Sequence, residues 1–472
     1  MRRCIFNGGL AVALLLYGAS FSRARATEPL APDSLPAHWT YLPDNIQEIP
    51  GGPSDTWWKQ FSDPVLDSLI VLGVERNYDL RIAARRREIA RAAMNQAKSG
   101  WYPTVSASLG WTHDQPSGAT GKGEPVSAPS ESFFNAGLSA SWEIDIFGRI
   151  AAGVKAKKAQ YRASRAEYAG AMVSMTAQIA ATYFTLRQQQ RLLQVALAHS
   201  ESQMKIVKIA EARFEATLAS KLDVAQAWQT YYSTIASIPP LESAIHASIN
   251  SLGILIGEFP AQAAAMLGDG GPLPNWQSTL PAGVPADILR RRPDIAAAEA
   301  NLGVAAAELG IARKDYLPVL SITGAIGTAA ERPKGLFKDG SLTWSVAPTL
   351  SWTVFDGLAR RAAVASARDE VEAQIANYNA TVQQAVAEVE NALRTYTDDL
   401  RRIDTLAEVV EQSRISLELS VDQYKQGLSP FTNVVDAQMN YLEYTNSLLA
   451  ARGDALASLA TLYRAMGGGI TR

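Results

Sequence analysis

The chain has 472 residues, 47% of them hydrophobic, and a formal net charge of -2. The absence of a basic excess argues against nucleic acid as a partner. Beyond the N-terminus no apolar run approaches the ~18 residues of a membrane-spanning helix, so none is expected in the body of the chain. The 4 histidines lack metal-ligand spacing, and phosphate-loop and nucleophile-elbow motifs are missing. We therefore predict no enzyme activity, no cofactor and no metal site.

The N-terminus has the pattern of a secretory signal peptide, which we assign to residues 1–26. Two arginines precede a short apolar stretch at residues 10–17, and a small-x-small cleavage pattern places the start of the mature chain at Thr27. The only cysteine, Cys4, lies inside the signal. The mature chain is therefore expected to be exported without a disulfide, and packing or assembly must hold it together.

Four segments of alternating apolar and polar residues predict β-strands, near residues 105–112, 135–144, 320–323 and 344–354. We expect each strand to be about ten residues long, as a tilted strand that crosses a bilayer must be. Alternation alone fits equally well a half-buried sheet in a soluble domain. However, the polar positions are mostly Ser, Thr, Asn and Gly, which suits a watery lumen, and aromatic residues lie near the strand ends.

Four strands are too few to close a barrel, for which about eight is the usual minimum. An open sheet in lipid leaves unpaired backbone groups, each of which costs several kcal/mol. If these strands lie in a membrane, several chains must share one barrel. The strands thus predict an oligomer without fixing the number of subunits.

Two stretches, from about 149 to 216 and from about 358 to 426, contain no proline and little glycine. Each predicts a helix of nearly 70 residues, or roughly 100 Å. Alanine is abundant in them, which favours close approach of neighbouring helices. Asp398 and Asp399, in the second stretch, are expected to be a solvated pair.

Each long helix is expected to end in a tight turn that leads into an antiparallel helix. In the first turn Ser220 and Asp223 form a Ser-x-x-acid capping pattern. In the second turn Gly427 suits a helix C-terminus because glycine tolerates a positive φ. Ser429 is then expected to cap the next helix, with Pro430 at its first position.

The two halves of the chain repeat one another, since Asp79 and Pro103 align with Asp294 and Pro318 without a gap. Repeats of this length indicate two copies of one structural unit. We assign the first copy to residues 27–256 and the second to 286–472, each a helix, two strands, a long helix and a further helix. The Pro- and Gly-rich residues 257–285 are expected to be a linker with little regular structure.

The residues of two blocks, 142–149 and 289–295, resemble TolC-type outer-membrane efflux proteins, the outer-membrane factors of resistance–nodulation–division (RND) pumps. The resemblance covers nearly all of the mature chain. The arginine run in the second block is expected to be only a solvated helix start. The resemblance implies a mixed α and β membrane protein, in which three chains form a 12-stranded outer-membrane β-barrel continuous with a long periplasmic α-helical barrel.

The same resemblance implies a homotrimer in the outer membrane of a Gram-negative bacterium, surrounded by outer-membrane lipid. It further implies a periplasmic adaptor protein and an inner-membrane efflux pump as partners, because the duct has no energy source. Many relatives carry a lipid on a cysteine that directly follows the apolar stretch. Residues 16–19 resemble that site but have alanine in place of the cysteine, so we expect an unlipidated chain.

Site residues follow from the resemblance, position by position. Asp436 matches an acidic position that faces the pore, Thr432 matches the narrowest apolar position, and Asp223 and Tyr424 match positions that hold neighbouring helices together. The tips that contact the adaptor are Thr217, Leu218, Ala219, Ser220, Gly427, Leu428 and Ser429. The chain departs from the family pattern at several tip positions, since Thr217 replaces a usual glycine, Thr432 a common leucine, and Ser429 and Asn433 charged residues.

The sequence thus predicts a passive exit duct for small molecules. Two alternatives stay open, namely an outer-membrane channel for type I protein secretion and an exported helical scaffold without a pore. The sequence names neither the cargo nor the cognate pump.

Overall fold

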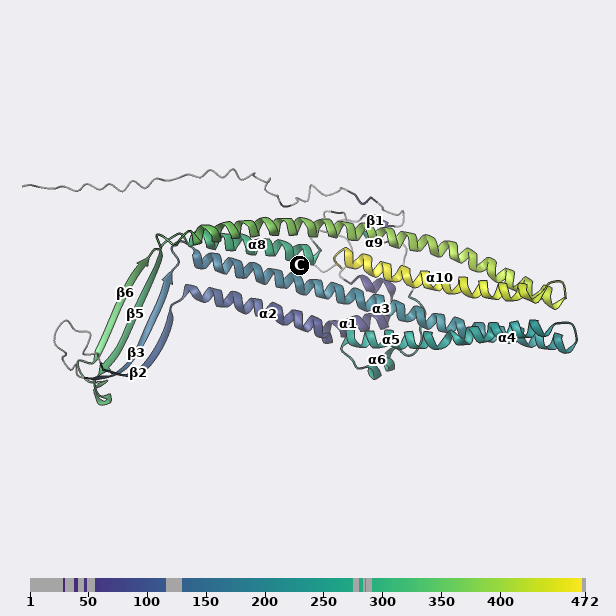
Figure 1. Ribbon diagram of the computed structural model, residues 1–472, viewed down its shortest axis with the longest axis horizontal. Coiled ribbons are helices and arrows are strands. Elements are labelled where there is room, and N and C mark those ends of the chain that lie inside the picture. The colour runs from purple at the N-terminus through teal and green to yellow at the C-terminus, as the bar shows by residue number, and fades with distance from the viewer. Residues whose placement is uncertain are drawn as a thin grey trace, which may run out of the picture.

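In a computed structural model of the chain, the structure describes residues 29, 38–40, 46–48, 56–115, 130–274, 280–282, 285 and 291–468. The predicted signal peptide, its cleavage site and the alanine at the lipidation position lie outside these residues. The described part is long and narrow, with a β-sheet at one end and two helical hairpins reaching the other end (Figure 1).

The helices account for most of the length. The described helices are α1 (Pro64–Arg76), α2 (Tyr78–Lys98), α3 (Arg149–Glu215), α4 (Lys221–Ala236), α5 (Ile238–Ile256), α6 (Pro260–Leu267), α8 (Pro293–Lys314), α9 (Ala359–Lys425) and α10 (Phe431–Ala465), with short 3-10 turns η2 (Trp57–Phe61), η3 (Ser99–Trp101) and η4 (Pro333–Gly335). The two predicted long helices are confirmed, because α3 and α9 contain 67 residues each. Next to the sheet α2, α3, α8 and α9 lie in a row, and α4 and α10 pack on the far ends of α3 and α9 (Figure 1).

The four predicted strands form one antiparallel sheet in the order β2 (Thr104–Asp114), β3 (Glu131–Ile144), β5 (Val319–Ala330) and β6 (Leu342–Ser351). Residues that pair directly across antiparallel strands share a face. The register therefore gathers the apolar residues on one face, in rows such as Val105, Ala140, Gly324 and Val346, and Ala107, Leu138, Ile326 and Trp344. The other face carries small and polar residues, in rows such as Ser106, Ser139, Ala325 and Ser345.

The apolar face of this sheet is exposed in a single chain. Leu109 is 81% exposed, Trp344 73% and Val346 65%, and no described element covers them. The outer edges of β2 and β6 also lack a partner strand among the described residues. An uncovered apolar face with two open edges is a surface that must meet lipid or another chain.

Glycines let β3 and β5 approach closely. Gly137 pairs directly with Gly327. A Cβ atom added at Gly327 would lie 2.7 Å from the Ala136 carbonyl oxygen and 2.9 Å from the Gly137 Cα. The centre of the sheet therefore has no room for a side chain at this position.

Matching contacts join the sheet to the helices in both halves. The indole N–H of Trp142 donates to the Trp101 carbonyl at 3.1 Å, and that of Trp352 donates to the Tyr316 carbonyl at 3.0 Å. At the start of α3, the Asp145 carboxylate accepts the backbone N–H groups of the first turn at 2.9 and 2.8 Å. This carboxylate satisfies N–H groups that have no partner inside the helix.

The main core lies halfway along the helices, where η2, α1 and α5 pack on α3, α9 and the end of α10. Arg187 is buried there, and its guanidinium donates to the Tyr183 hydroxyl at 3.0 Å and to the Asp269 carbonyl at 3.0 Å. The Tyr183 hydroxyl in turn donates to Asp63, the N-cap of α1, at 2.7 Å. This chain of hydrogen bonds satisfies a buried cation, which is otherwise costly.

Two expectations about chain organisation need correction. The helix that follows the first turn is interrupted at Ser237, where α5 begins with Ile238 and two prolines that cannot donate hydrogen bonds. The segment 257–285 is also more ordered than expected. It contains α6 and the short strand β4 (Leu280–Ala282), which pairs in parallel with β1 (Ile46–Glu48).

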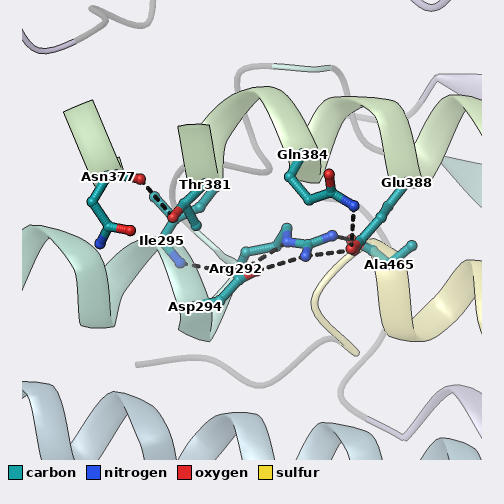
Figure 2. A network of polar contacts seen from close by, with 8 residues as sticks. All are labelled: Arg292, Asp294, Ile295, Asn377, Thr381, Gln384, Glu388 and Ala465. Carbon is teal, nitrogen blue, oxygen red and sulfur yellow. Dashed lines mark hydrogen bonds and ion pairs between the residues drawn. The ribbon is translucent and has the colours of Figure 1, made fainter. Parts of the chain in front are cut away.

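The expectation that the arginine run is only a solvated helix start is wrong for Arg292. This side chain is buried at the N-cap of α8 (Figure 2). Its guanidinium donates to Asp294 at 2.6 Å, to Glu388 of α9 at 2.7 Å and to the carbonyl of Ala465, the last residue of α10, at 2.8 Å. One side chain thus joins three helices, and its charge also suits the negative C-terminal end of α10.

The acidic pair on α9 is likewise not simply solvated. The Ser458 hydroxyl of α10 donates to the Asp399 carboxylate at 2.6 Å, while Asp398 pairs with Arg394 at 2.8 Å. Asp399 therefore helps to hold α10 against α9.

Among the described helices, α8 alone is long and apolar enough to span a membrane by length and composition. This differs from the expectation that the body of the chain holds no such helix. Because α8 packs along both α3 and α9, it belongs to the helical row.

Candidate gate at the helical tips

The two helical hairpins end in tips, which we define as residues 216–220 (first tip) and 426–430 (second tip). In the first tip Leu218 N–H donates to the Arg213 carbonyl at 2.8 Å, and Thr217 has a φ of 61°. In the second tip Leu428 N–H donates to the Gln423 carbonyl at 2.9 Å, and Gly427 has a φ of 75°. Both tips therefore have the backbone of a Schellman motif, although Thr217 adopts it with a side chain that disfavours a positive φ.

The tips differ in how the next helix starts. As predicted, Ser220 is the N-cap of α4, and its hydroxyl accepts the Asp223 N–H at 3.2 Å and lies 2.7 Å from the Asp223 carboxylate. The predicted Gly427 at the end of α9 is confirmed. The predicted Ser429 cap, with Pro430 at the first helical position, is wrong, because Pro430 is the N-cap of α10 and no side chain caps this helix. Ser429 instead accepts a hydrogen bond from the Asn433 side-chain amide at 2.8 Å.

A small core holds the two hairpins together just behind the tips. Its buried residues come from α3, α4, α9 and α10 and are Ile206, Val207, Ala210, Ala227, Tyr424, Phe431 and Val434. The Tyr424 and Phe431 rings meet edge to face, with centroids 5.0 Å apart. This ring contact packs α9 against α10 within the second hairpin, and the residues of α3 and α4 in the same core join that hairpin to the first.

Arg213 links the two hairpins directly behind the tips, a role that the sequence did not indicate. Its guanidinium donates to the Lys425 carbonyl at 2.7 Å and lies over the Tyr424 ring, 4.9 Å from the centroid. The sequence gives no signal for this contact, because Arg213 and Lys425 lie on different long helices.

Tyr424 and Asp223, predicted to hold helices together, do lie in contact. The Tyr424 hydroxyl donates to the Asp223 carboxylate at 3.4 Å, which is a long hydrogen bond. Burial raises the pKa of Tyr424, and the Asp223 charge raises it further. The phenol therefore keeps its proton and stays a donor throughout the neutral range.

Thr432 and Asp436 lie apart from this cluster. Both are exposed and stand one turn apart on α10, so they share one face of the helix. Leu218 and Leu428 are also exposed, at 65% and 75%, and form the apolar ends of the two tips. The candidate site thus has two parts, a buried clamp around Tyr424 and an exposed face around Asp436.

Replacing Arg213 with alanine is expected to loosen the tips without unfolding the chain. The variant loses a charge-assisted hydrogen bond and a cation–π contact at a half-buried site, worth about 1–2 kcal/mol together. Hydrogen exchange measured by mass spectrometry should show faster exchange at residues 421–435 and no change in the central core. An Arg213→Lys control keeps the charge but loses the planar stacking, so it should lie in between. Equal protection of the tips in all three proteins would contradict this role.

Within the part of the chain that the structure describes, no group of three or more His, Cys, Asp or Glu side chains could hold a metal ion.

Comparisons with known proteins agree with this architecture. Residues 69–258 and 284–468 match the family model for outer membrane efflux protein. The matched ranges contain the four long strands and both tips.

Two relatives and one solved structure illustrate the similarity. The solvent efflux pump outer membrane protein SrpC of Pseudomonas putida is 30% identical over 411 residues, or 87% of this chain and 86% of SrpC. The pyoverdine export outer membrane protein OpmQ of Pseudomonas aeruginosa is 29% identical over 477 residues, or 98% of this chain and 97% of OpmQ. The outer-membrane channel OprN matches with a TM-score of 0.86 and 28% identity, over 92% of this chain and 97% of OprN.

Proposed function

Since this chain belongs to the outer membrane efflux protein family, we propose that three copies of it enclose one duct that leads from the periplasm to the cell exterior. Members of this family are outer-membrane efflux channels that reach into the periplasm, and they are not enzymes.

The open-edged sheet is the observation that supports a barrel shared between chains, and the number three comes from the family resemblance. Four strands cannot close a barrel, and the edges of β2 and β6 have no described partner. Lipid does not tolerate open edges, because their backbone groups stay unpaired. Three copies supply twelve strands, with the apolar face toward outer-membrane lipid and the Ser- and Gly-rich face toward the lumen.

The helices support the same assembly. The row of α2, α3, α8 and α9 leads directly from the sheet, so three copies give a helical barrel of similar girth. We also infer two tandem repeats, residues 27–256 and 286–472, joined by 257–285. The shared order of helix, two strands, long helix and helix supports them, as do the matching indole contacts at Trp142 and Trp352.

The tips are the proposed docking site for a periplasmic adaptor protein, with an inner-membrane efflux pump beyond it. The names of SrpC and OpmQ place those two relatives in efflux or export systems, one for solvent and one for pyoverdine. Because these two cargoes are chemically unlike, we propose small molecules as the cargo class and no particular compound. The exposed leucines at the tips offer apolar contacts to such an adaptor.

We assign the constriction to Thr432 and Asp436, which in three copies make a ring of acidic side chains. Such a ring favours cations at a narrow point. Asp436→Ala is therefore expected to raise single-channel conductance in planar bilayers and to reduce cation preference. Asp422→Ala, which removes an exposed carboxylate of α9 near the same tip, serves as the matched control. If both variants conduct like the parent protein, the constriction lies elsewhere.

The same bilayer measurement separates the duct from the two alternatives. A scaffold without a pore gives no conductance and fractionates away from the outer membrane. A type I protein-secretion channel conducts as well, so co-purification of the inner-membrane partner decides between protein export and small-molecule efflux. Native mass spectrometry in detergent should show three chains, and a monomer would exclude the shared barrel.

A further inference from the structure

A cavity of about 670 Å³ lies between α2, α3 and α8, well away from the tips and from the sheet. We propose that it is a binding site for a small amphiphilic anion, meaning an apolar body that carries carboxylate, sulfonate or phosphate groups. The size falls in the range of sites for small organic molecules. The proposal is independent of the gate, because no residue of the tips lines the cavity.

The charged residues that line the cavity are strongly unbalanced. Four are arginines and one is an acid, namely Arg87, Arg162, Arg165, Arg291 and Glu299. Neither Arg162 nor Arg165 takes part in an ion pair between described residues, and both are exposed. The like charges of these two side chains repel each other, and a bound anion relieves that repulsion.

One of the arginines is already held in place. Arg87 of α2 pairs with Glu88 at 3.0 Å, and its guanidinium lies over the Tyr168 ring of α3, 4.9 Å from the centroid. A guanidinium fixed in this way loses less conformational entropy when it binds an anion. Guanidinium groups also match the planar, two-oxygen geometry of carboxylates and sulfonates.

The floor of the cavity is apolar because α3 and α8 approach closely through small residues. A Cβ atom added at Gly303 of α8 would lie 3.5 Å from the Cβ of Ala159 on α3. The apolar lining residues of α3 and α8, which we call the floor, include Ala159, Met172, Pro293, Ala296, Ala300 and Gly303. An apolar floor below a cationic rim fits a ligand that has both characters, rather than a free inorganic ion.

The position of the cavity excludes a membrane lipid as the ligand. Arg162 lies thirteen residues after the start of α3 at the sheet, which is roughly 20 Å at 1.5 Å per residue. Pro293 lies at the far end of α8, roughly 32 Å from the sheet. The polar headgroup layer extends only about 5–8 Å beyond the hydrocarbon core.

The test measures binding of 1,3,6,8-pyrenetetrasulfonate to the full-length protein in a nonionic detergent. Fluorescence anisotropy of the probe is the readout. Its four charges keep this probe out of micelles, and its ring system supplies the apolar body. The parent protein is expected to bind one probe per chain, with an affinity that falls as salt is raised. Arg162→Gln combined with Arg165→Gln should raise Kd about tenfold or more.

Two further variants separate a built site from general attraction to positive charge. Arg191→Gln combined with Arg452→Gln removes two arginines from a different cavity and gives the same change of net charge. This control should leave Kd within about twofold of the parent value. Ala300→Phe fills the floor without changing the charge, and it should weaken binding as well.

Three results overturn the site. These are no saturable binding to the parent protein, an equal loss of affinity in the two double-arginine variants, or unchanged binding in Ala300→Phe. A normal conductance of each variant in planar bilayers shows that the channel is assembled. Failure of the proposed duct and failure of this site are therefore distinguishable.

Discussion

Arg292→Ala is expected to lower the apparent melting temperature of the protein by about 2–3 °C, because it removes the side chain that joins α8, α9 and α10. Removing one partner of a fully buried ion pair costs about 3–5 kcal/mol. Here Asp294 and Glu388 remain 46% and 42% exposed, so water compensates part of the loss. We therefore expect about 2–3 kcal/mol, mainly from the unpaired Ala465 carbonyl and the space left behind.

Two further variants make this expectation specific. Arg292→Lys keeps the charge but cannot reach three acceptors with one planar group. Its melting temperature should therefore fall between those of the parent protein and Arg292→Ala. Arg361→Ala removes an exposed arginine near the start of α9 and should change the melting temperature by less than about 1 °C. Circular dichroism of detergent-solubilised protein measures all of them. An Arg292→Ala protein as stable as Arg361→Ala would show that the junction is not structural.

Gly327→Ala is expected to reduce the amount of folded barrel, because its methyl group collides with the backbone of β3. The nearest atoms are the Ala136 carbonyl oxygen at 2.7 Å and the Gly137 Cα at 2.9 Å, and neither can move aside without shifting the strand. Overpacking of this kind costs about 1–3 kcal/mol in each chain. In the proposed trimer the cost is incurred three times.

Gly324→Ala is the matched control, because a Cβ atom at that position meets only the Ser345 carbonyl oxygen, at 3.7 Å. Gly324 lies on the same strand and should accept the methyl group. The measurement is the fraction of outer-membrane protein that runs as a compact oligomer in unheated gel samples. If Gly327→Ala and Gly324→Ala give the same fraction, the close approach of β3 and β5 is not needed for assembly.

Much of the fold could be predicted because local sequence patterns decide it. The two long helices begin and end within about two residues of the expected positions, since proline is absent from them and their turns have strong signals. The apolar and polar faces of the sheet could be predicted as well, because the alternation is regular and the register keeps the apolar residues together. The cap at Ser220 was correct for the same local reason.

The features that could not be predicted depend on contacts between distant residues. Arg292 belongs to a run of arginines, and only the fold shows that it meets Glu388 of α9 and the end of α10. Arg213 has no distinguishing neighbour in sequence, yet it binds the carbonyl of Lys425. The predicted Ser429 cap is wrong because α10 begins one residue later than expected, at Phe431, with Pro430 as its N-cap. At the tips, local rules and the family resemblance identified Tyr424 and Asp223 but missed the cation between the hairpins.

The equal size of α3 and α9, with 67 residues each, has a consequence for the far end of the molecule. Both helices start at the sheet, so both hairpins stop at one level and present a flat rim to whatever docks there. One residue inserted into only one of them would lift that hairpin by about 1.5 Å and turn its tip through about 100°. Lineages that lengthen or shorten this duct should therefore change the two helices by the same number of residues.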